Sequence, residues 1–250
     1  MNLTNSPLWI FFFSFVALSI SVLIGDVLRN RVRSFTQEER DDFGTVLGAT
    51  LTLLALLIGF SFSMAVSRYD LRKNYEEAEA NAIGTEYVRA DLLPAENTVR
   101  VRELLKKYTD QRLLFYTTRD RRRLAKINGD TSQLQNELWS SIRPSANVQS
   151  TPTLALAVSG MNDVLNSQGY TQAAWWNRIP TGAWALMAVI AVVCTLMVGF
   201  GAHHRDWRML LIVPLAVSIA FYLIADIDSP RGGTIRVIPQ NLLSLSQSLQ

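Results

Sequence analysis

Four apolar stretches that contain no Asp, Glu, Lys or Arg constrain this chain more than any other feature. They cover residues 1–25, 43–67, 179–204 and 209–225. An apolar run of about 18 or more residues is long enough to cross the hydrocarbon core of a bilayer as a helix. The pattern therefore excludes a soluble globular enzyme and a disordered chain. It also excludes a disulfide-stapled secreted domain, because the sequence has one cysteine, Cys194.

The predicted fold is an all-α, multi-pass membrane protein with four transmembrane helices. Span one covers about residues 7–28, and its basic residues follow the apolar stretch, so we expect a retained helix and not a cleaved signal peptide. Span two covers about residues 43–67, and spans three and four lie within 179–228. Four crossings place both termini on one side. Arginines near the membrane divide evenly between the two sides, so the positive-inside rule leaves the orientation open.

Residues 68–178 carry most of the charged side chains and form the predicted helical extramembrane domain between spans two and three. Pro94 favours a helix start, because the first turn of a helix needs no N–H donor there. A third helix is expected over 132–142, ended by the proline two positions later. Thr151 followed by proline is typical of another helix start. We expect a small helical bundle here and a tail over 229–250.

The chemistry-bearing motifs of enzymes are absent from the sequence, which has no glycine-rich phosphate loop, nucleophile elbow, paired-cysteine motif or His-Glu zinc spacing. We expect no enzyme activity, no cofactor and no metal. Asp226 and Asp228 supply too few oxygen ligands for calcium and are typical of an acidic helix end before a turn. A basic cluster lacks a supporting recognition fold, so no nucleic-acid partner is expected. This cluster comprises Arg119, Arg121, Arg122, Arg123 and Lys126.

Span two carries a stripe of small or hydroxylated residues. On a helix that turns about 100° per residue, the stripe falls on one face. Such a face lets helices approach closely in lipid and form hydrogen bonds across the contact. Composition alone favours this packing interpretation. Alternatively, copies from several subunits line an aqueous path, with Leu56 or Phe60 as an apolar constriction. The small members of the stripe are Thr45, Gly48, Ala49, Thr52, Gly59, Ser63 and Ser67.

Residues 57–70 resemble the second transmembrane helix of bestrophin anion channels. In both, a Gly-Phe pair is followed by an Arg-aromatic pair where the helix leaves the membrane, here Phe60 and Arg68. The whole chain is similar to bacterial bestrophin-like membrane proteins, and the similarity is carried by the segments 79–85, 91–94 and 222–233.

The resemblance implies a homo-oligomer, a pentamer in the family, in the bacterial inner (plasma) membrane, with membrane lipid and small inorganic ions as partners. It also implies that span two lines the pore and that Thr52, Leu56 and Phe60 occupy the neck, although Thr52 departs from the apolar character of that neck. We therefore expect a passive ion channel, with anions as candidate ions and with Thr52 and Ser63 offering hydroxyls. The alternative is a non-conducting scaffold or sensor, in which the bundle binds a partner and the stripe of Thr45, Gly48 and Gly59 only packs.

Overall fold

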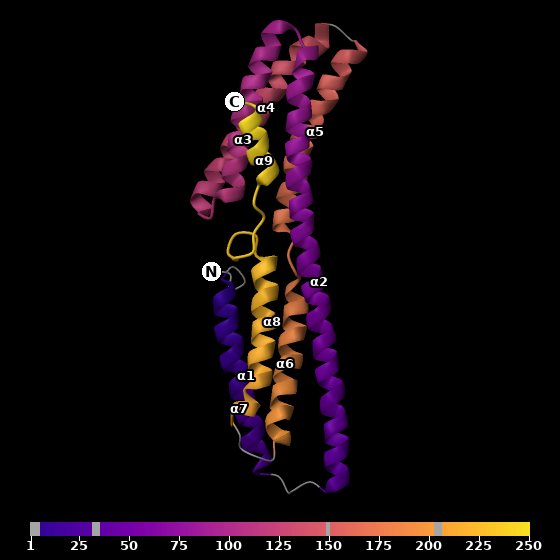
Figure 1. Ribbon diagram of the computed structural model, residues 1–250, viewed down its shortest axis with the longest axis vertical. Coiled ribbons are helices and arrows are strands. Elements are labelled where there is room, and N and C mark those ends of the chain that lie inside the picture. The colour runs from indigo at the N-terminus through magenta and orange to yellow at the C-terminus, as the bar shows by residue number, and fades with distance from the viewer. Residues whose placement is uncertain (1–5, 32–35, 149–150, 203–206) are drawn as a thin grey trace. The chain divides into compact units, whose positions relative to one another are not determined.

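The computed structural model describes residues 6–31, 36–148, 151–202 and 207–250, and every regular element in those residues is helical. This confirms the predicted all-α class. The elements in chain order are α1 (Pro7–Arg29), α2 (Gln37–Arg89), the 3₁₀ turn η2 (Ala90–Leu92), α3 (Ala95–Thr117), α4 (Arg121–Val148), α5 (Pro152–Trp176), α6 (Thr181–Gly201), α7 (Trp207–Leu210), α8 (Ile212–Asp228) and α9 (Gln240–Ser248) (Figure 1).

The chain divides into two compact units. Unit 1 comprises Met1–Arg68 and Arg178–Arg236, and unit 2 comprises Tyr69–Asn177 and Val237–Gln250. In the part of the chain that the structure describes, four helical stretches are long and apolar enough to cross a membrane. Helix α2 runs for 53 residues without interruption and contributes residues to both units.

In unit 1, α1 and α6 meet at glycines. A Cβ atom added to Gly25 would collide with the carbonyl oxygen of Leu196, and one added to Gly199 would collide with that of Val22. The Ser21 hydroxyl also donates across this contact to a carbonyl of α6 at 2.9 Å. Close backbone approach and such polar bonds hold helices together in lipid, where no hydrophobic force acts between them.

The fourth apolar run is divided into α7 and α8, which the sequence did not predict. Leu211 separates the two helices, and Pro214 lies in the first turn of α8. Proline has no N–H to donate to the carbonyl four residues earlier, so the helix restarts where that donor is not required. The sequence leaves only residues 203–208 between spans three and four, which predicts a tight hairpin; residues 203–206 of this connection lie outside the described residues.

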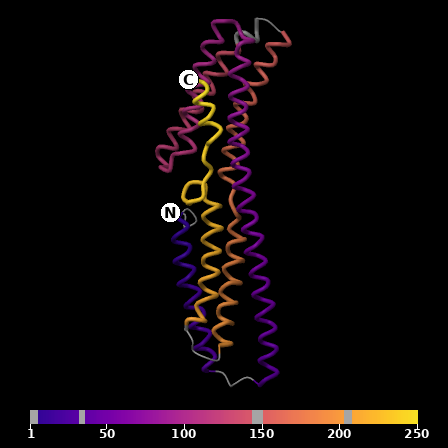
Figure 2. Tube along the Cα trace, in the orientation of Figure 1, coloured from indigo at the N-terminus to yellow at the C-terminus, as the bar shows by residue number. Residues whose placement is uncertain are grey.

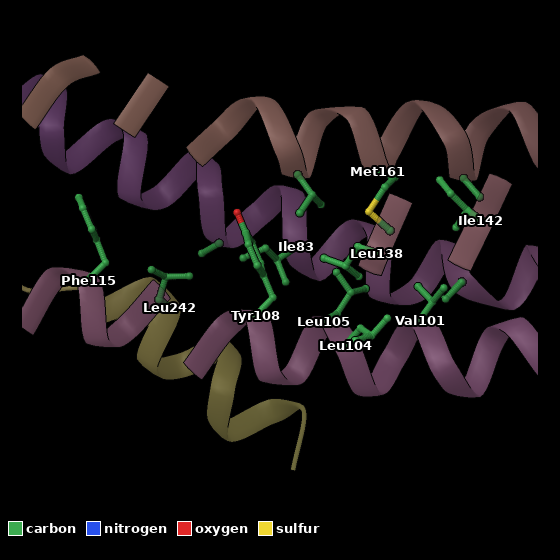
Figure 3. Packing of buried hydrophobic residues seen from close by; sticks show 14 of the residues in the cluster. Ile83, Val101, Leu104, Leu105, Tyr108, Phe115, Leu138, Ile142, Met161 and Leu242 are labelled. Atoms are coloured by element: carbon green, nitrogen blue, oxygen red, sulfur yellow. The ribbon is translucent and has the colours of Figure 1, made fainter. Parts of the chain in front are cut away.

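Unit 2 has an apolar core to which α2, α3, α4, α5 and α9 contribute. Figure 3 shows Ile83, Leu105, Leu138 and Met161 from four of these helices pointing toward one another. All four side chains are fully buried. Burial of such side chains contributes about 1.5–3 kcal/mol each, so this shared interior holds the helices together.

The helix boundaries of unit 2 are partly as expected. Helix α3 begins directly after Pro94, and the Thr151 hydroxyl accepts the N–H of Leu154 at 3.2 Å to cap α5. The predicted helix over 132–142 is wrong at both ends, since α4 extends from Arg121 to Val148. A proline this close to a helix end removes one hydrogen bond but does not prevent a final turn.

The segment after α8 contains α9, which the sequence did not predict. Figure 2 shows α9, near the yellow end of the tube, beside α3. The Glu76 carboxylate accepts the backbone N–H of Leu242 at 2.9 Å and the side-chain amide of Asn241 at 2.7 Å. A carboxylate at a helix N-terminus satisfies free N–H groups and complements the helix dipole, so Glu76 fixes the position of α9.

Candidate functional site

The span-two part of α2 has two contrasting faces. Leu54, Ser61 and Ala65 are buried, at 2%, 4% and 0% exposure. These three residues recur at helical spacing and therefore share one side of α2. Near the N-terminal end of α2, Phe43 lies on the same side, and its ring is 5.8 Å from the ring of Phe200 in α6. Among the described residues, none covers the opposite face in a comparable way.

The predicted site residues all lie on this uncovered face. Leu56 is 53% exposed and Phe60 is 60% exposed, and with the exposed Leu53, Phe62 and Met64 beside them they form part of an apolar surface typical of contact with lipid or another chain. The structure thus brings the predicted residues onto one face of one helix and does not gather them in a cavity. Those exposed on this face are Thr45, Gly48, Thr52, Leu56, Gly59, Phe60 and Ser63.

The glycines of the stripe pack against no residue in the part of the protomer that the structure describes. A Cβ atom added to Gly48 or Gly59 would meet nothing within 4 Å. Glycine in a helix interior costs about 1 kcal/mol relative to alanine. Within the described residues the stripe has no packing partner, so packing as an interpretation of the stripe refers to contact with another chain.

The threonine hydroxyls on the stripe are bonded to their own helix. Thr45 donates to the carbonyl of Asp41 at 2.9 Å, and Thr52 donates to the carbonyl of Gly48 at 2.8 Å. Such bonds to the carbonyl four residues earlier are common for threonine in helices. They leave the oxygen lone pairs outward, so Thr52 can donate to an anion only after its hydroxyl hydrogen turns away from Gly48.

The acidic pair after span four holds the following turn in place. Asp226 accepts three hydrogen bonds of 2.8 Å, from the N–H and hydroxyl of Thr234 and from the N–H of Ile235. Asp228 accepts the N–H of Ile179 at 3.2 Å and lies 4.0 Å from Arg68. These donors occupy the oxygens that a cation would need.

Glycine is required in the same turn. A Cβ atom added to Gly233 would collide with the carbonyl oxygen of Asp226. The described residues contain no group of three or more His, Cys, Asp or Glu side chains that could hold a metal ion. The acidic pair is therefore an architectural feature of this end of α8.

A model of the bestrophin-like domain matches residues 11–242 of the chain. The chain belongs to the bestrophin-like family. No match is found among curated proteins.

Solved structures show the same fold. A crystal structure of a bacterial bestrophin homolog from Klebsiella pneumoniae carrying a point substitution gives a TM-score of 0.65 at 15% identity, over 96% of this chain and 97% of that chain. The structure of that homolog phased with zinc gives 0.63 at 15% identity, over 95% of each chain. A third crystal structure, described as a membrane protein, gives 0.66 at 15% identity, over 95% of this chain and 97% of that chain. Family, fold and four apolar helices identify a membrane protein.

The family-like segments of this bestrophin-like protein have structural roles. Glu79 forms a fully buried ion pair with Arg112 and accepts hydrogen bonds from Tyr116 at 3.0 Å and Thr171 at 3.1 Å. Burial lowers the pKa of Arg112, but the Glu79 carboxylate, together with the phenols of Tyr108 and Tyr116, raises that pKa above its ordinary value. Burial, reinforced by Glu79, raises the pKa of Tyr116, so this phenol stays protonated as a donor.

Sequence reasoning missed this buried pair. Its members are 33 positions apart on α2 and α3, and each looks like a surface charge on a helix when taken alone. The segment 91–94 also has a structural role. The Asp91 carboxylate forms an ion pair with Arg102 at 2.8 Å, and Pro94 directly precedes the first residue of α3. The signal that marked these segments was the family resemblance, and no local pattern identified their partners.

Proposed function

We propose that this bestrophin-like protein is a passive ion channel, with anions as the candidate ions, assembled from several copies in the bacterial inner membrane. The exposed face of α2 lines the path, and Leu56 and Phe60 form its constriction. The helical domain of residues 68–178 lies outside the membrane. The observation that carries the proposal is that the small-residue stripe is exposed and that its glycines contact nothing in the described part of the protomer.

The chemistry of this face suits a gated path. Leu56 and Phe60 lie one helical turn apart, so in a ring of copies they would make two stacked apolar belts that control wetting. Thr52 lies one turn before the belts, and Ser63 lies close to one turn after them. Small residues elsewhere on the stripe allow neighbouring helices to approach. Both bulky and small positions therefore have a use in an assembly that they lack in the protomer.

Ion flux into liposomes tests the proposal. Purified protein should conduct a halide, and Phe60→Ala or Leu56→Ala should change the flux several-fold because each removes one apolar belt. Phe12→Ala is the matched control, since Phe12 is 56% exposed on α1, an equally apolar surface that the path does not use. Its flux should equal that of the wild type. Absence of both anion and cation flux from confirmed oligomers would contradict the proposal.

A further inference from the structure

Glu86 differs from the other buried glutamates of α2. Glu76 and Glu79 are buried and hydrogen-bonded, as expected for carboxylates removed from water. Glu86 has 0% exposure, and neither of its carboxylate oxygens has a hydrogen-bond partner among the described residues. An ionised carboxylate in this condition is strongly unfavourable, whereas a neutral carboxyl group is tolerated.

The carboxyl group of Glu86 is set directly against α5. A Cβ atom added to Gly160 of α5 would collide with Oε2 of Glu86 and lie 2.8 Å from Nη1 of Arg89. Arg89, one turn further along α2, donates instead to the carbonyl of Leu156 in α5 at 3.4 Å. The two helices therefore meet at a glycine, with a carboxyl group and a guanidinium group of α2 both directed at the α5 backbone.

The charges that face Glu86 come from both helices. Burial raises the pKa of Glu86 to about 8, Arg89 on α2 opposes this rise, and Asp163 on α5 adds to it. The group is therefore protonated at neutral pH in the folded chain, whereas in an unfolded chain it titrates near 4.5. The folded state binds the extra proton, so the stability that Glu86 contributes is complete below pH 4.5 and falls as the pH rises through about 8.

We propose that Glu86 is a proton-binding site that controls the contact between α2 and α5. With its proton, the carboxyl group stays buried against Gly160. Without it, the carboxylate needs either water or Arg89 as a partner. Water requires α5 to move away, and pairing with Arg89 removes the bond to Leu156, so both responses loosen the same contact. Alkaline pH should therefore loosen α5 from α2 near Gly160.

Hydrogen exchange of the α5 amides around Gly160, measured on the full-length protein in nanodiscs between pH 6 and 10, tests this site. After correction for intrinsic exchange, protection in the wild type should fall at least tenfold across that range, while Glu86→Gln should keep its protection. Glu77→Gln, an exposed glutamate of the same helix, is the matched control and should respond as the wild type does. An identical pH response in wild type and Glu86→Gln would overturn the proposal.

Infrared spectroscopy follows the proton itself. The band of a protonated carboxyl group should disappear between pH 6 and 10 in the wild type and be missing in Glu86→Gln. Asp163→Asn should move the transition to lower pH because a like charge is removed, and Arg89→Gln should move it to higher pH. If Glu86→Gln does not fold, the opposite pH shifts of Asp163→Asn and Arg89→Gln still test the proposal. A carboxylate already ionised at pH 6 would refute the site, and none of these measurements depends on ion flux.

Discussion

Two small-residue helix faces in unit 1 have opposite surroundings. The α1–α6 contact uses Gly25 and Gly199 to bring backbones together, and neither position has room for a methyl group. The α2 stripe has Gly48 and Gly59 in open space. Small residues in apolar helices predict close approach in both cases. The difference is that the first face finds its partner within the chain, whereas no described residue of the chain covers the glycines of the second.

Alanine at the packed glycine should have the largest effect on stability. In Gly199→Ala the new methyl group meets the carbonyl of Val22, and the backbone of α1 or α6 must shift. Overpacking of this kind costs about 1–3 kcal/mol. Thermal unfolding in detergent should show a midpoint several degrees lower than that of the wild type. An unchanged midpoint would remove the contrast between the two faces.

The serine at the packed contact should have an intermediate effect. Ser21→Ala removes the 2.9 Å bond to the carbonyl of Val192, which is worth about 1 kcal/mol. Ser63→Ala on the α2 stripe is the matched control and should leave the thermal midpoint unchanged in the dissociated protomer. Equal losses in the two variants would show that the stripe is also packed within one chain.

Alanine at the open glycine should have the smallest effect on the protomer, with the opposite sign. Gly59→Ala should stabilise α2 by up to about 1 kcal/mol, because alanine is the better helix former and the added methyl group meets nothing. Analytical ultracentrifugation of the same variant should show weaker self-association. A destabilised protomer would mean that Gly59 is used internally.

The sequence predicted the features that depend on local chemistry. The apolar runs, the cap at Thr151 and the shared face of Thr52, Leu56 and Phe60 follow from hydropathy, turn chemistry and helical period. The partners of these helices did not follow, because lipid and a neighbouring helix both accept apolar side chains. Gly25 was one small residue among many in span one, and only the structure shows what it touches.

Long-range polar contacts were also beyond local patterns. The sequence placed Glu79 on a helix but did not indicate that Arg112 covers it. Glu86 looked equivalent to its helical neighbours, although it alone is buried without a hydrogen bond among the α2 glutamates that the structure describes. Burial and partner geometry decide the chemistry of a carboxylate, and both arise only when α3 and α5 pack on α2.

The most direct test of the central proposal is the structure of the assembled protein at side-chain resolution. The proposal predicts a continuous central path, lined by the α2 face, with Leu56 and Phe60 of every copy projecting into it. A stripe sealed against another helix, with no path, would contradict channel function and support a scaffold. A stripe that faces lipid would contradict both.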